Sequence, residues 1–173
     1  YNVLYHNMDI PNKASGDAGS LTLGVNSKAP LKDIVVNGNV IIGGNNALRL
    51  DKAESSSFKN NIVYTGYVHL YTNATENINT WDFNNNEYYT KNNRAVRIIK
   101  KEDYIFKNWQ STFGLDLNSK WNTIKSFQMD EILNITQNEY KKERFKITLF
   151  NIKGENVFVN ASKFNKTKGT RYK

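Results

Sequence analysis

Four residues recur at one position of a repeated strand pattern, and their types suit the binding of an acidic sugar chain. Each lies between two apolar residues, so its side chain is expected to point outward while its neighbours point into a core. Arginine forms bidentate hydrogen bonds with carboxylate or sulfate groups, so a column containing arginines would suit a polyanionic polysaccharide. The four residues are Thr22, Arg49, His69 and Arg97.

A polysaccharide lyase needs these residue types, because it must neutralise a uronate carboxylate and then remove the proton on the adjacent carbon. Arg49, Arg97 and Asp51 are the predicted substrate-binding residues, and Asp51 lies two positions beyond Arg49. His69 or Tyr71 is the predicted catalytic base, since histidine titrates near neutral pH and tyrosine acts when cations depress its pKa. A second interpretation is that these side chains are simply the solvated outer face of a sheet.

The elements that must position this column are short strands, each reading apolar, polar, apolar. The last apolar residues of successive copies are roughly 20 to 28 residues apart, a period typical of stacked repeats. Between them runs a second, asparagine-rich series of strands. Stacked copies would pair as parallel strands about 4.8 Å apart and enclose a common core. The four copies are Ser20 to Leu23, Ala47 to Leu50, Tyr67 to Leu70 and Ala95 to Ile98.

The asparagines lie where the chain must turn between strands. Asparagine tolerates the left-handed backbone conformation and bonds to neighbouring backbone groups, so a structural role is expected, including bonds between stacked turns. The second series contains 37–42, 60–64 and 84–89.

The run Asn60 to Tyr64, followed by an alternating strand, resembles the right-handed parallel β-helix repeat of bacterial secreted, pectate-lyase-like proteins. Lys107 to Gln110 and Gly114 to Ser119 resemble the segment that closes such helices. The resemblance covers about residues 1–120 and implies an all-β fold, a parallel β-helix solenoid. It further implies a bacterial protein, secreted or at the cell surface, that acts on polysaccharide. Because this fold also serves adhesins, a non-catalytic adhesin or surface-structure subunit is the alternative.

A different organisation is predicted after the repeats. Asp103 is expected to cap a short helix in which Ile105, Trp109 and Phe113 recur at spacing four, and Gly114 to end it. Residues 121–173 are then predicted to form a small antiparallel β appendage with a basic tail. Its hairpin would pair 144–150 with 157–159 across a turn at 153–156, and 132–135 would add a further strand.

Charge is concentrated at the C-terminal end of the 173-residue chain. Residues 141–173 contain 10 lysines and arginines against Glu143 and Glu155, which accounts for the entire net charge of +8. This stretch is a candidate contact for an anionic surface, while nucleic acid is not predicted as a partner because ordered aromatic residues do not interleave with the charges. The chain begins at Tyr1 within an expected strand, which favours a processed protein or the C-terminal part of a longer one.

Several other classes of chemistry are not expected. The chain has no cysteine, no run of apolar residues long enough to span a bilayer and only two histidines, so no metal site, cofactor or membrane span is predicted. An inverting hydrolase would need two carboxyl groups roughly 6.5–9.5 Å apart. Of the outward-capable acids Asp51, Asp82 and Glu87, only Asp51 joins the column, so a hydrolase centre is not predicted either.

Overall fold

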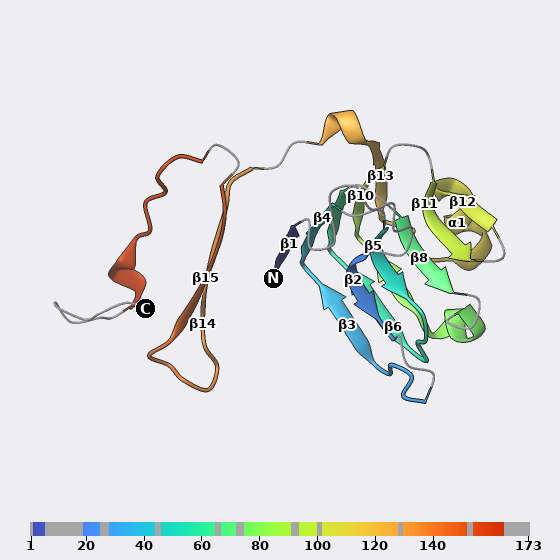
Figure 1. Cartoon of the computed structure of the whole chain (residues 1–173), viewed down its shortest axis with the longest axis horizontal. Helices are drawn as coiled ribbons and strands as arrows, with labels where there is room; N and C mark the ends of the chain where they lie inside the picture. The colour runs from blue at the N-terminus through green and yellow to red at the C-terminus, as the bar shows by residue number, and fades with distance from the viewer. Residues whose placement is uncertain are drawn as a thin grey trace, which may run out of the picture. The chain divides into compact units, whose positions relative to one another are not determined.

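The computed structural model describes residues 2–5, 19–24, 28–43, 46–64, 67–71, 75–90, 94–99, 102–127, 130–151 and 154–164. The chain divides into two compact units, Tyr1–Phe127 and Gln128–Lys173, and each is described by itself. Strands are the main element of the first unit, the second unit has one two-stranded sheet, and most of the strands are labelled in Figure 1.

The described residues of the first unit form three sheets, and successive strands of the chain enter them in turn (Figure 1). The first sheet is wholly parallel, in the order β1 (Val3–Tyr5), β4 (Val40–Ile42), β7 (Ile62–Tyr64), β10 (Glu87–Thr90) and β13 (Lys120–Thr123). The second has the order β12 (Glu102–Ile105), β11 (Arg94–Ile99), β8 (Tyr67–Tyr71), β5 (Asn46–Leu50) and β2 (Gly19–Leu23). The third, also parallel, has the order β3 (Ile34–Asn37), β6 (Ser56–Lys59) and β9 (Asp82–Asn84).

The predicted stacking of the four repeat copies is confirmed in the second sheet. Leu21 pairs with Leu48, Leu48 with Val68, and Val68 with Val96, all in parallel register. The strands therefore form where the period-two pattern predicts them, because a one-residue slip would turn the apolar side chains outward.

The predicted fold class, a right-handed parallel β-helix, is wrong. The strands lie in several small separate sheets that do not close into a solenoid, and the pairing is mixed. In the second sheet, β12 runs antiparallel to β11 and ends the parallel series. The sequence repeat sets which residues pair along one sheet, but it does not set how separate sheets close against one another.

A single apolar core fills the first unit, built from the inward residues of all three sheets. On β6 the burial alternates with period two, so that Phe58 is buried and stacks obliquely on Phe83 of β9 at 5.4 Å between ring centroids. Tyr88 and Trp109 are fully buried in the same core. These large rings fill the volume that aliphatic residues leave between the sheets.

One short helix, α1 (Phe106–Phe113), follows β12 and buries Phe106 and Trp109. The helix is found where sequence predicts it, but the predicted cap is wrong: Ile105 occupies the N-cap position without a side-chain hydrogen bond, and Asp103 belongs to β12. Gly114 ends the helix as predicted, with a φ of 67°.

The asparagine turns form a ladder of hydrogen bonds that joins neighbouring strands of the first sheet. The backbone N–H of Asn39 donates to Asn61 Oδ1 at 3.0 Å, that of Asn61 to Asn86 Oδ1 at 3.0 Å, and that of Asn86 to Ser119 Oγ at 2.8 Å. Asn60 and Asn85, which precede two of these residues, have φ values of 54°. The predicted structural role of the asparagines is confirmed.

Two further short helices lie in the described part of the first unit. Both are 3₁₀ helices: η1 (Thr75–Thr80) precedes β9, and η2 (Ile124–Ser126) follows β13. Phe127, directly after η2, contacts Tyr64 and Tyr89 with ring centroids 4.3 and 5.0 Å away. These rings cover part of the outer side of the first sheet.

The second unit contains a two-stranded antiparallel sheet of β14 (Ile132–Gln137) and β15 (Phe145–Phe150), followed by the 3₁₀ helix η3 (Ala161–Phe164). The predicted pairing of 144–150 with 157–159 is wrong, since β15 pairs with β14. Residues 157–159 have no regular structure, and Phe158 is 90% exposed. Phe164 packs on Phe145 at 4.7 Å between centroids.

Candidate functional site

The four column residues lie side by side at equivalent positions of neighbouring strands. Thr22 of β2 pairs with Arg49 of β5, Arg49 with His69 of β8, and His69 with Arg97 of β11. Parallel neighbours are about 4.8 Å apart, so the column crosses four strands of one rigid sheet. The sequence-predicted register therefore holds across all four residues.

Arg49 is held by the carboxylate of Asp51 on the same strand segment. Its Nε donates to Asp51 Oδ1 at 3.0 Å, and the side chains are only 18% and 13% exposed. A guanidinium held this way has a fixed orientation, and its charge is compensated by Asp51. A ligand carboxylate would therefore have to bind the same guanidinium group beside Asp51. The pair offers fixed donors and acceptors at the sheet surface.

Arg97 is held by the carboxylate of Asp103, the residue that was predicted to cap a helix. Asp103 is its register partner on the antiparallel strand β12, and Arg97 Nε and Nη2 donate to the two oxygens of Asp103, the latter at 2.6 Å. Arg94 Nη1 lies 3.4 Å from Asp103 Oδ2. The hydrogen bonds from Arg97 hold the pKa of Asp103 below its usual range, against the opposite effect of partial burial.

The predicted bases have defined strand positions. His69 lies within β8, and Tyr71 ends β8 opposite Ile99 of β11. Their side chains lie outside the described part of the molecule, so the catalytic role of His69 or Tyr71 stays a prediction. Asp51 follows β5 directly, and its backbone N–H donates to Leu23 O at 3.1 Å.

Two arginine side chains on one sheet, each oriented by a carboxylate, can bind hydroxyl and carboxylate groups of a sugar chain. Arg97 is the more accessible of the two, with 37% of its side chain exposed. Within the described residues, no group of three or more histidine, aspartate or glutamate side chains gathers to hold a metal ion. No helix among them is long and apolar enough to cross a membrane.

A second polar cluster is buried beneath α1, around Asp116. Its carboxylate, fully excluded from solvent, accepts hydrogen bonds from Trp109 Nε1 at 3.0 Å, from Ser119 Oγ at 2.6 Å and from Asn86 Nδ2 at 2.9 Å. The hydroxyl of Tyr88 lies 3.2 Å from both carboxylate oxygens. Burial raises the pKa of Asp116, while these donors lower it. The cluster ties the helix to two strands of the first sheet and is enclosed within the core.

Sequence reasoning missed Asp103 as the partner of Arg97, because the 102–105 segment was attributed to the start of a helix. It also missed the environment of Asp116. A signal for the latter was present, since Asp116 directly follows the apolar Leu115 and precedes Ser119 by three residues, a spacing typical of a local hydrogen-bonded turn.

Comparisons with known proteins give no match: no protein family, no curated protein and no solved structure is significantly similar to this chain. Functional inference therefore rests on the arrangement of its own residues.

Proposed function

We propose that this protein acts on an acidic polysaccharide, bound across the second sheet by the column Thr22, Arg49, His69 and Arg97. The observation that supports the proposal is the register of these residues on neighbouring strands, with both arginines oriented by carboxylates. A polysaccharide presents charged groups at regular intervals, and a row of side chains on a rigid sheet matches such a ligand better than a small anion. A uronate carboxylate that shares the Arg97 guanidinium with Asp103 would fix one sugar unit.

The proposed reaction is β-elimination. Arg97 neutralises the uronate carboxylate and so makes the hydrogen on the adjacent carbon more acidic. His69 or Tyr71 removes that proton, the electron pair forms a carbon–carbon double bond, and the glycosidic oxygen leaves with a proton from solvent. The products are a shortened chain and an unsaturated uronate end, and no cofactor takes part.

A non-catalytic role as a surface or adhesion module is the second candidate, and one observation favours it. Both arginines already bind protein carboxylates, Asp51 and Asp103, which compensates their charge. Mixed donor and acceptor pairs of this kind bind sugar hydroxyls without promoting proton removal. Binding without turnover is the outcome that would select this role.

The decisive experiment incubates the purified chain with polygalacturonate and with alginate, and follows both binding by affinity electrophoresis and the ultraviolet absorbance of the unsaturated product. We expect Arg97→Ala to weaken binding roughly 10- to 100-fold, the loss of a charged hydrogen-bonding group. Lys120→Ala, which removes one positive charge from an exposed position of the first sheet, is the matched control and should bind normally.

The outcomes separate the candidates. Product formation that His69→Ala or Tyr71→Phe abolishes supports the lyase and identifies its base. Binding that depends on Arg97 without any product supports the non-catalytic module. Binding that is equal in the wild type, Arg97→Ala and Lys120→Ala would refute the column as the polysaccharide site.

A further inference from the structure

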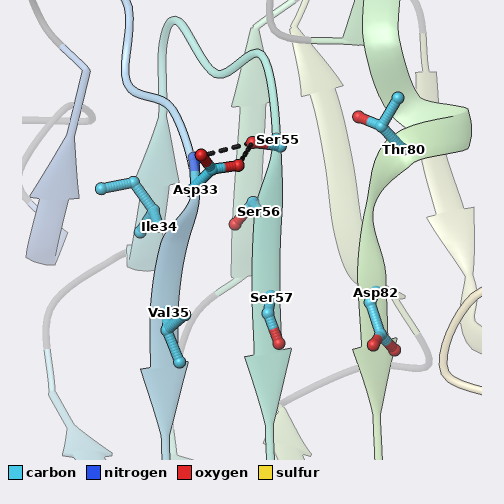
Figure 2. A pocket seen from close by; sticks show the side chains of 8 residues that line it. All are labelled: Asp33, Ile34, Val35, Ser55, Ser56, Ser57, Thr80 and Asp82. Carbon is cyan, nitrogen blue, oxygen red and sulfur yellow. Dashed lines mark hydrogen bonds between the residues drawn. The ribbon is translucent and has the colours of Figure 1, made fainter.

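A shallow cleft of about 230 Å³ lies on the solvent side of the third sheet, away from the arginine column. Figure 2 shows its lining side chains, which come from β3, β6 and β9 and from the segments just before them. They are mostly small or acidic: Asp33, Ile34, Val35, Ser55, Ser56, Ser57, Thr80 and Asp82.

The cleft exists because a short side chain lies between two longer ones. Val35 of β3 pairs with Ser57 of β6, and Ser57 with Asp82 of β9, so the three are neighbours in one row across the sheet. Their sequence neighbours Val36, Phe58 and Phe83 point into the core and are buried, which turns this row outward. Serine at the central position leaves a trough between Val35 and Asp82, and Figure 2 shows these three side chains on neighbouring strands.

The walls of the trough combine fixed hydrogen-bond acceptors with one apolar surface. Asp33 Oδ1 accepts a hydrogen bond from Ser55 Oγ at 2.7 Å, and Asp82 forms an ion pair with Lys59, so both carboxylates are held in place. The Thr80 hydroxyl lies within hydrogen-bond distance of two backbone oxygens, Glu54 O at 2.7 Å and Asn77 O at 2.8 Å, and its own oxygen can accept a hydrogen bond. Val35 is 70% exposed and supplies the apolar wall.

These features match a neutral sugar ring better than other ligands. Sugar hydroxyls donate hydrogen bonds to carboxylates, and the carbon-bound hydrogens of a pyranose pack on an apolar side chain. Lys59 balances the charge of Asp82, so Asp33 leaves these three groups with one net negative charge, which disfavours an anionic ligand. The cavity is smaller than the roughly 300–1,000 Å³ typical of sites for drug-sized ligands, which limits the occupant to about one ring.

We propose that this cleft binds one neutral pyranose unit, with hydroxyl groups donating to Asp33 and Asp82 and the ring face on Val35. The inference does not depend on the acidic polysaccharide site, because it concerns another sheet and a ligand of the opposite charge preference.

The test is a titration of the protein with the methyl glycosides of glucose, galactose, mannose and xylose, followed by saturation-transfer difference and amide shifts in NMR. We expect at least one of them to bind with a Kd of about 1 mM, the weak affinity of a shallow site. Galacturonate should bind at least tenfold more weakly than galactose. Ser57→Leu fills the trough and should weaken binding at least tenfold, whereas Ser111→Leu, the same change on the exposed side of α1, should not.

Arg97→Ala should leave the binding of these glycosides unchanged. Val35→Ser, a second variant at an exposed position, should weaken binding even if Ser57→Leu disturbs folding. The proposal is overturned if none of the four glycosides binds, if galacturonate binds as well as galactose, or if folded Ser57→Leu or Val35→Ser binds like the wild type.

Discussion

Arg97 and Asp103 face each other across the antiparallel strands β11 and β12, and the guanidinium donates to both carboxylate oxygens. The pair has two consequences. It orients the most accessible arginine of the column, and it links the last parallel strand of the second sheet to the strand that ends the series.

Acidification should remove the stabilisation from this pair. The pKa of Asp103 is lowered in the folded state, so its stabilising effect is present above the unfolded pKa of about 3.9 and is lost as pH falls through the lowered value. We expect Asp103→Asn to cost about 1 kcal/mol at neutral pH, because Arg97 is partly solvent-exposed. Urea midpoints of wild type and variant should converge below about pH 4. A difference in urea midpoint between wild type and Asp103→Asn that stays constant down to strong acid would contradict the ion-pair assignment. Asp130→Asn, at an exposed position of the second unit, is the control.

Replacing Asp116 by asparagine should destabilise the first unit although the two side chains have nearly the same shape. The carboxylate accepts hydrogen bonds from Asn86, Trp109 and Ser119, and the amide group of an asparagine would set a donor against at least one of them. The expected loss in unfolding free energy is about 2–4 kcal/mol by urea denaturation. Asp82→Asn, at an exposed position, should change it by less than about 0.5 kcal/mol. An Asp116→Asn variant more stable than wild type would mean that the cost of burying the charge exceeds its hydrogen bonds.

Trp109 and Trp81 should respond differently to the same substitution. The indole N–H of Trp109 donates to Asp116, whereas the buried indole N–H of Trp81 has no hydrogen-bond partner in the described structure. Phenylalanine at 109 removes a donor from a buried carboxylate, so a loss of about 2–4 kcal/mol is expected. Phenylalanine at 81 also removes an unsatisfied donor, which offsets the lost volume and limits the loss to about 1 kcal/mol. Thermal unfolding followed by circular dichroism compares the two, and equal losses would refute the argument.

Gly24 and Gly38 form a matched pair for alanine substitution. Both have positive φ, 74° and 65°, but a Cβ at Gly24 would lie 2.3 Å from the carbonyl oxygen of Lys52, while nothing lies within 4 Å of one at Gly38. We expect Gly38→Ala to cost about 1 kcal/mol from backbone strain alone. Gly24→Ala should cost about 3 kcal/mol, because backbone atoms must also move apart. Similar urea midpoints for the two variants would show that the backbone at Lys52 moves aside at little cost in free energy.

The sequence could predict the strand register and the asparagine turns because both depend on local patterns. The alternation of apolar and polar residues correctly predicts the pairing of Leu21, Leu48, Val68 and Val96. The ladder of Asn39, Asn61 and Asn86 forms because asparagine favours turns. The column of Thr22, Arg49, His69 and Arg97 was predicted from the same register. These features need only short-range information and a pattern that recurs along the chain.

Features that depend on long-range packing were not predictable in the same way. The spacing of Ile105, Trp109 and Phe113 correctly indicated a helix, but it also led to the wrong prediction that Asp103 caps that helix. Pairing with β11 instead keeps residues 102–105 in strand β12. How the sheets close depends on core volume, which no local pattern encodes. The pairing of β15 with β14 instead of 157–159 likewise required choosing between two chain segments of similar alternation. The cleft over Ser57 was missed because a serine between two longer residues becomes a trough only once three strands are aligned.

The asparagine ladder also bears on how much this chain can vary in length. Its successive hydrogen bonds join residues 22, 25 and 33 positions apart. In each of them a backbone N–H donates to a side-chain oxygen of the next turn. The ladder thus fixes one corner of the structure and leaves the intervening segments free to differ in length. Insertions and deletions are therefore expected to be tolerated in the segments away from that corner. New loops grafted into those segments would change the ligand without a redesign of the scaffold.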